Sequence, residues 1–181
     1  SKRGGAWMDE CLIRHQTKDG NIIPPVAYLI CNQTPPVGKT PSLMSFEEVE
    51  TLFHEFGHGL QHMLTEVDYP QAAGINNVEW DAVELPSQFM ENWCYDQKTI
   101  MGIARHWETN EELPKQEFEK LLLSRTFNSG LSTLRQINFA LTDLRLHNQW
   151  SKELGISPDE LRREIAINTS IIPPIKEDQF L

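Results

Sequence analysis

Two kinds of hydrophobic pattern divide this chain, and the first of them covers its N-terminal quarter. β-forming residues cluster at 6–11 and 25–32, and the turn-rich segment 17–21 lies between the clusters. They predict an antiparallel pair or small sheet. The Pro- and Gly-rich segment 32–42 is expected to cross the surface as a linker, because its prolines cannot donate backbone hydrogen bonds.

Further along, apolar residues recur at steps of three and four, which is the spacing of one helix face. Ser45 followed by Glu48 fits a capping box at a helix N-terminus. Segment 65–77 lacks periodicity and is interpreted as a loop, and a second helix is expected over about 78–96, with Pro86 as a kink. The stripe of the first helix comprises Phe46, Val49, Leu52, Phe53, Phe56, Leu60, Met63 and Leu64.

The remainder of the chain is helical by pattern. Pro114 stands near one helix start, and Ser157 with Glu160 repeats the capping logic before another. A long apolar stripe comprises Phe127, Leu131, Leu134, Ile137, Leu141 and Leu144. We therefore predict a mainly α (α+β) fold with a small antiparallel β-sheet near the N-terminus. Residues 1–181 are expected to form one segment with three parts. They are 1–42 (small sheet and linker), 43–98 (two helices that carry the candidate metal ligands discussed below) and 99–181 (helical subregion).

Composition narrows the function. The 181 residues suffice for one domain, and 39% hydrophobic with 23% charged residues is typical of a soluble globular protein. A formal charge of -10 opposes binding to nucleic acid and to anionic membranes, and no run approaches the roughly 20 apolar residues of a membrane span. Three widely spaced cysteines favour a reducing compartment over a disulfide framework. We expect an intracellular protein.

The strongest chemical signal is the segment HEFGHGLQHML, which begins at His54. His54 and His58 are four residues apart, so on a helix both imidazoles lie on one face, about 6 Å apart along the axis. Zn²⁺ binds such nitrogens at ~2.0–2.1 Å, and a catalytic site keeps one coordination position open. Glu55 then lies beside that position as a general base. This is the HExxH pattern of zinc peptidases.

Residues around the motif refine this prediction. Gly57 and Gly59 each cost a helix interior about 1 kcal/mol relative to Ala, which indicates a close approach by another backbone or by a substrate. His62 lies about 12 Å along the axis from His54, too far to share one ion, and is interpreted as a rim or structural histidine. A metzincin requires a third histidine where this chain has Leu64.

A carboxylate must complete the ligand set. Spacing alone leaves Glu79 and Glu84 both open as the metal ligand. A neighbouring carboxylate, including Glu50 from the first helix, is expected to accept the second ring N–H of a ligating histidine. Asp81, Glu84, Gln88 and Glu91 share one face if 78–96 is a helix. The acidic candidates downstream of the motif are Glu66, Asp68, Glu79, Asp81, Glu84 and Glu91.

The two segments HEFGHGLQHML and WDAVELPSQFMENW together resemble the thimet oligopeptidase and oligopeptidase A family of zinc metallopeptidases. KRGGAWMDEC, PVAYLICN and DLRLH resemble further segments of that family in the same order. The resemblance implies a helical zincin-type catalytic core with one Zn²⁺ per chain, zinc-dependent endopeptidase activity on short peptides, and the following site. Glu55 is the base, His54, His58 and Glu84 hold the metal, and Glu50 and Asp81 are the carboxylates that support the ligands.

The resemblance also sets limits. Family members are several-fold longer, and a GYxxxYY-type segment of theirs, which this chain lacks, supplies tyrosines that stabilise the oxyanion. Losing one such donor costs about 10²–10³ in turnover. We therefore expect residues 1–181 to be the catalytic core of a larger metallopeptidase. The alternative is a catalytically incompetent helical scaffold or interaction fragment that retains the motif.

Expectations about substrate and location follow from the same resemblance. The substrates are short peptides, including peptide fragments and cleaved signal or targeting peptides. The protein is expected to be monomeric and cytoplasmic, or alternatively to lie in a mitochondrial or chloroplast matrix. Strand 25–32 is either an ordinary core strand or an edge to which an extended peptide adds. Trp80, Phe89 and Trp93 are expected in the core.

Overall fold

A computed structural model describes residues 4–178 of the chain. The chain forms two compact units, Ser1–Pro114 and Lys115–Leu181, and each is described by itself below. The expected mainly α class with a small antiparallel sheet is confirmed. The boundary between the units falls inside the segment 99–181 that we expected to be one helical subregion.

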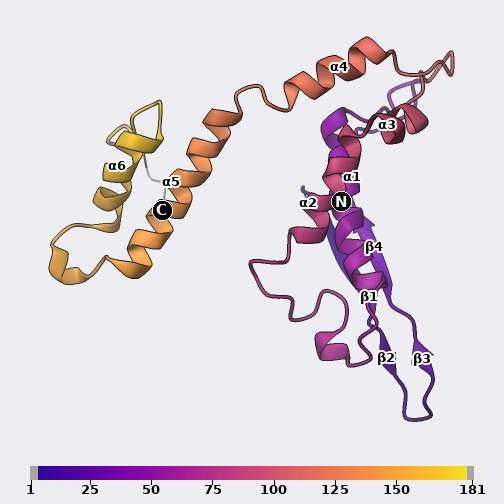
Figure 1. The fold of residues 1–181 in the computed structure, drawn as a ribbon, viewed down its shortest axis with the longest axis horizontal. Coiled ribbons are helices and arrows are strands. Elements are labelled where there is room, and N and C mark those ends of the chain that lie inside the picture. The colour runs from indigo at the N-terminus through magenta and orange to yellow at the C-terminus, as the bar shows by residue number, and fades with distance from the viewer. Residues whose placement is uncertain (1–3, 179–181) are drawn as a thin grey trace. The chain divides into compact units, whose positions relative to one another are not determined.

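The first unit begins with a two-stranded sheet. Strand β1 (Trp7–Leu12) pairs antiparallel with β4 (Val26–Ile30), and Trp7 lies opposite Ile30. Between the two strands a short hairpin, β2 (His15–Gln16) and β3 (Ile22–Ile23), carries the turn-rich segment at its tip (Figure 1). The predicted antiparallel pair is therefore confirmed.

Helix α1 (Phe46–Met63) starts where the sequence predicts. The Ser45 hydroxyl accepts from the backbone N–H of Glu48, and the Glu48 carboxylate accepts from the backbone N–H of Ser45, so the capping box is complete. The fully buried residues of α1 are Glu55, Gly57, Gly59 and His62, whereas the residues of the apolar stripe are partly buried or exposed. This helix packs against α2 at Gly57 and against Leu29 of β4 at Gly59, and Phe56 remains 39% exposed.

The expected helix over 78–96 is wrong in its extent. Residues 78–84 form turns, α2 spans only Leu85–Glu91, and a 3₁₀ turn follows at Asn92–Tyr95. Pro86 lies in the first turn of α2 and does not kink it, because the first helical N–H groups need no partner within the helix. Another 3₁₀ turn (Pro70–Ala72) precedes this region, and α3 (Gln97–Ile103) follows it.

The second unit consists of helices. They are α4 (Lys115–Ser124), α5 (Ser129–Asn148) and α6 (Pro158–Thr169), with a 3₁₀ turn at Lys152–Leu154. The Ser157 and Glu160 capping box opens α6 as predicted. Within residues 4–178, every helix is too short or too polar to cross a bilayer.

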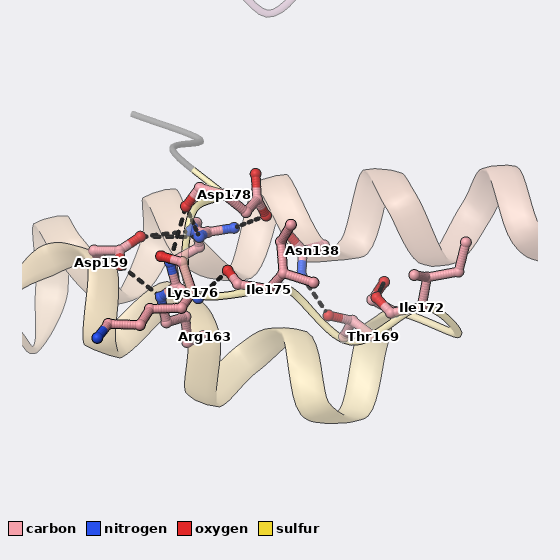
Figure 2. A network of polar contacts seen from close by, with 10 residues as sticks. Asn138, Asp159, Arg163, Thr169, Ile172, Ile175, Lys176 and Asp178 are labelled. Carbon is pink, nitrogen blue, oxygen red and sulfur yellow. Dashed lines mark hydrogen bonds and ion pairs between the residues drawn. The ribbon is translucent and has the colours of Figure 1, made fainter.

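The segment after α6 is held by arginine side chains, as Figure 2 shows. Arg163 donates to the carbonyls of Ile175 (2.6 Å) and Lys176 (3.1 Å), and Arg162 donates to the Asp178 carboxylate (3.1 Å). Both guanidinium groups also bind Asp159, and hydrogen bonds first from Arg163 and then from Arg162 hold the pKa of its carboxyl below the usual value.

Candidate metal centre

Two imidazoles on α1 and one carboxylate at the start of α2 converge on a single point. The Nε2 atoms of His54 and His58 each lie 3.2 Å from Oε2 of Glu84. The two rings have centroids 5.0 Å apart and planes at 82°. Because the histidines are one turn apart, the helix itself sets their separation. Glu84 reaches them from the N-cap position of α2.

The donor set and its spacing fit a zinc ion. Two ligands bonded at ~2.0–2.1 Å and separated by a tetrahedral angle lie about 3.3 Å apart. Both histidine-to-Glu84 distances are 3.2 Å, and all three donor atoms lie within 4.8 Å of one another. Two neutral imidazoles and one carboxylate form a ligand set known from catalytic zinc sites. The residues present therefore suit the metal that the motif implies.

The hydrogen-bond partners of His54 also favour metal binding at its Nε2 atom. Its Nδ1 lies 2.6 Å from Oε1 of Glu91, while its Nε2 faces Glu84. A neutral imidazole carries one N–H, so a histidine that donates from Nδ1 presents a lone pair at Nε2. A lone pair aimed at a carboxylate oxygen is unfavourable unless a cation lies between the two. Glu91 thus fixes the tautomer in which Nε2 is free to bind metal.

The carboxylate that lies at Nδ1 of His54 is that of Glu91, and not that of Glu50, for which we predicted such a contact. Glu50 accepts a hydrogen bond from the Tyr95 hydroxyl instead (2.8 Å). Asp81 is exposed in the turns before α2, off the helix face on which it was placed, and its role stays a prediction. The sequence contains a signal for Glu91, because it lies seven residues after Glu84 and shares its helix face, but that spacing does not assign the roles.

Glu55 is poised beside the histidines. It is only 6% exposed, and no partner among residues 4–178 is described for its carboxylate. Two clefts meet at Glu55 and His54. One, of about 340 Å³, is also lined by Glu50 and Glu91, and the other, of about 590 Å³, is also lined by Trp80. A carboxylate here reaches the space in which a substrate carbonyl would lie next to the ligand atoms.

The large aromatic residues near the centre are not in the core. Trp80 is 93% exposed, Phe89 is 61% exposed and Trp93 is 43% exposed, so the expectation that they pack inside is wrong. Trp80 lies in the turns before α2, Phe89 lies on α2, and Trp93 lies in the 3₁₀ turn that follows it. Trp80 borders the larger cleft directly.

Close helix contact explains one of the two motif glycines. A Cβ on Gly57 would lie 2.5 Å from the Pro86 carbonyl oxygen and 2.6 Å from Cα of Ser87, so only glycine lets α1 and α2 touch here. Gly59 faces the side chain of Leu29 at 3.2 Å, which is a less severe contact. The approach predicted from the glycines is therefore made by backbone at Gly57.

His62 lies outside the ligand cluster, as its distance along the helix requires. Its side chain is fully buried, and Nε2 donates to the carbonyl of Leu12 at the end of β1 (2.8 Å). Gly74, which has a positive φ of 66°, lies against its ring and leaves no room for a Cβ. His62 thus ties α1 to the sheet and to the 65–77 loop, which supports the structural interpretation.

Within residues 4–178, Cys11, Cys31 and Cys94 form no disulfide, and none of them belongs to the ligand cluster. Burial is the main factor that raises the pKa of the Cys94 thiol to about 11, and the charges of Glu50 and Glu91 add to it. A thiol with that pKa stays protonated at neutral pH, so Cys94 is a poor ligand and a poor nucleophile.

Comparison with known proteins supports the interpretation of this cluster as a peptidase metal centre. The family model "Peptidase family M3" matches residues 1–178. Organellar oligopeptidase A, chloroplastic/mitochondrial, of Arabidopsis thaliana is 55% identical over 99% of this chain and 23% of its own length. Probable cytosolic oligopeptidase A of the same plant is 54% identical over 99% of this chain and 26% of its own length.

A bacterial relative extends the comparison. Oligopeptidase A of Escherichia coli (strain K12) is 47% identical over 96% of this chain and 25% of its own length. The chain thus spans about a quarter of the length of these curated relatives. Because the family model covers nearly every residue, including the HExxH helix and the segment with Glu84, the chain belongs to peptidase family M3.

Proposed function

We propose that this chain forms the catalytic core of a zinc-dependent endopeptidase that hydrolyses internal bonds of short peptides. The observation that carries the proposal is the convergence of His54, His58 and Glu84 beside the buried carboxylate of Glu55. Membership in peptidase family M3 supports it. The alternative, an incompetent scaffold that retains the motif, gives no reason for a histidine held between two carboxylates.

Each residue has a defined task in this proposal. His54, His58 and Glu84 would hold the zinc, which when bound supplies a Lewis acid that polarises the scissile carbonyl and makes water more acidic. Glu55 takes the proton of the attacking water and returns it to the leaving amine. Glu91 keeps the Nδ1 proton of His54 in place throughout. Burial of Glu55 strengthens its interaction with the reacting groups.

The clefts suggest how a peptide lies across the site. Ala6, just before β1, lines both clefts, and Trp7 and Met8 of β1 line the larger one. We predicted strand 25–32 to be either a core strand or an edge for an added peptide, and the strand that lines the larger cleft is β1. A peptide would thus run along β1, with one portion in the smaller cleft, which Glu50 and Glu91 line, and another portion beside Trp80 in the larger cleft.

Zinc content and a single substitution test the proposal. Protein dialysed without chelator should retain about one zinc per chain, and Glu55→Gln should keep the metal. The same change should lower peptide hydrolysis by about 10²–10⁴-fold, because it removes the proton acceptor. Absence of stoichiometric zinc in the unsubstituted protein would support the scaffold instead. Full hydrolysis by Glu55→Gln would remove Glu55 from the mechanism.

The identity of the acidic ligand has its own test. Glu79 is exposed in a turn, whereas the Glu84 carboxylate lies against both histidines. Glu84→Ala should release the metal, and Glu79→Ala, its matched control, should not. The reverse outcome would indicate a thermolysin-like ligand arrangement.

Substrates, partners and location belong to the same proposal. We infer that the substrates are peptide fragments, including cleaved signal or targeting peptides, and that the protein is a monomer that binds neither nucleic acid nor membranes. The formal charge of -10 supports the exclusion of nucleic acid. The names of the relatives, one cytosolic and one chloroplastic/mitochondrial, support an intracellular location in the cytoplasm or an organelle matrix.

A further inference from the structure

Ser87 contacts the carboxylate that faces the two histidines. Its hydroxyl lies 2.8 Å from Oε2 of Glu84, the same oxygen that is 3.2 Å from both imidazole nitrogens. The serine is fully buried, although the Glu84 side chain is 53% exposed. The buried Ser87 hydroxyl therefore donates to the half-exposed Glu84 carboxylate at the point where the candidate ligand atoms converge.

Glu84 depends on such a contact for its orientation. It occupies the N-cap position of α2, yet its side chain makes no capping hydrogen bond to that helix. A long side chain that is half exposed samples several rotamers unless a partner holds it. Among residues 4–178, the contacts described for this carboxylate are those with the two histidines and with Ser87.

The position of Ser87 is itself fixed by α1. A Cβ on Gly57 would lie only 2.6 Å from Cα of Ser87. Because glycine has no Cβ, Ser87 can pack directly against α1 at this position. The hydroxyl is thereby held against the helix that carries both histidines. The distance between the histidines and Glu84 thus depends on a backbone contact and on one hydroxyl.

We propose that Ser87, seated against Gly57, is a positioning residue that holds the Glu84 carboxylate toward His54 and His58 by donating its hydroxyl proton to Oε2. The inference rests on the proposed zinc site. The hydroxyl also lies 3.0 Å from the Glu84 backbone carbonyl, an acceptor that many helical serines use. A purely structural serine would donate there and would have no influence on the metal.

Zinc affinity separates these two roles. The affinity is measured on the purified protein by competition with a colorimetric zinc chelator, and the unfolding midpoint of the metal-free protein is measured alongside. Ser87→Ala should weaken zinc binding by about 10–100-fold, as for other groups that orient a metal ligand. The matched control is Thr142→Val, which removes a buried hydroxyl that donates only to the carbonyl of Asn138 and should leave the affinity unchanged.

A double substitution tests whether Ser87 acts through Glu84. A Glu84→Ala variant loses its zinc on dialysis but keeps His54 and His58, which bind added zinc weakly. In that background Ser87→Ala should change the weak zinc affinity by less than about twofold, because the group that Ser87 orients is gone. An equal loss in both backgrounds, or no loss in the single variant, overturns the proposal while unsubstituted protein still binds zinc. If the unsubstituted protein takes up no zinc, the proposed function itself fails.

Discussion

Replacing Gly57 with alanine tests the helix contact that holds the site together. The new Cβ would lie 2.5 Å from the Pro86 carbonyl oxygen, whereas ordinary contact begins at 3.4 Å. The obstacle is backbone, not the end of a flexible side chain, so the start of α2 must recede by about 0.9 Å. Overpacking of this kind costs about 1–3 kcal/mol.

A smaller effect acts in the opposite direction. Alanine is favoured over glycine in a helix interior by up to about 1 kcal/mol. We therefore expect the Gly57→Ala variant to lose up to about 2 kcal/mol of unfolding free energy in the metal-free state. Zinc affinity should fall at least tenfold, because Glu84 moves with α2 and a built site tolerates deviations of only about 0.2 Å in ligand distance.

Urea denaturation of the metal-free protein measures the first quantity, and chelator competition measures the second. The matched control is Gly102→Ala in α3, where an added Cβ meets no atom within 4 Å. That variant should be as stable as the original protein or more stable, with unchanged zinc affinity. Gly57→Ala protein that equals the original in both measurements would refute the close-contact argument.

Two further variants probe the orienting carboxylate and the arginine network of the second unit. Glu91→Gln removes the charged acceptor of the His54 Nδ1 proton and should weaken zinc binding by about 10–100-fold, measured by equilibrium dialysis; unchanged affinity would exclude this role. The pKa of Asp159 is lowered by hydrogen bonds first from Arg163 and then from Arg162, so its carboxylate stabilises the fold above about pH 4 and this contribution is lost as the pH falls further. Asp159→Asn should therefore reduce the decrease in melting temperature between pH 7 and pH 3, and an undiminished decrease would contradict the assignment.

Local signals predicted the helix starts well and the extent of the second helix poorly. Ser45 and Ser157 cap α1 and α6 where the capping boxes predict, because a cap depends only on neighbours three residues away. The sequence pattern over 78–96 predicts a helix as clearly as the patterns of α1 and α6 do. Pro86, however, belongs to a first turn, and the chain before it folds as turns that carry Trp80 to the edge of a cleft.

The buried face of α1 shows a second limit of pattern reasoning. Its apolar stripe predicted a helix, yet the buried residues are Glu55, Gly57, Gly59 and His62. Periodicity reports which residues share a face, but burial depends on which neighbour packs there. At Gly57 the neighbour is the backbone of α2, which admits no side chain.

The placement of His54 and His58 on one helix face follows from sequence alone, because residues four apart on a helix share a face whatever surrounds them. The partners from elsewhere in the chain do not follow in this way. Whether Glu79 or Glu84 faces the histidines, and whether Glu50 or Glu91 supports His54, depends on how two helices approach each other. That approach results from backbone contact at Gly57 and from where α2 begins, which are properties of packing that no local spacing contains.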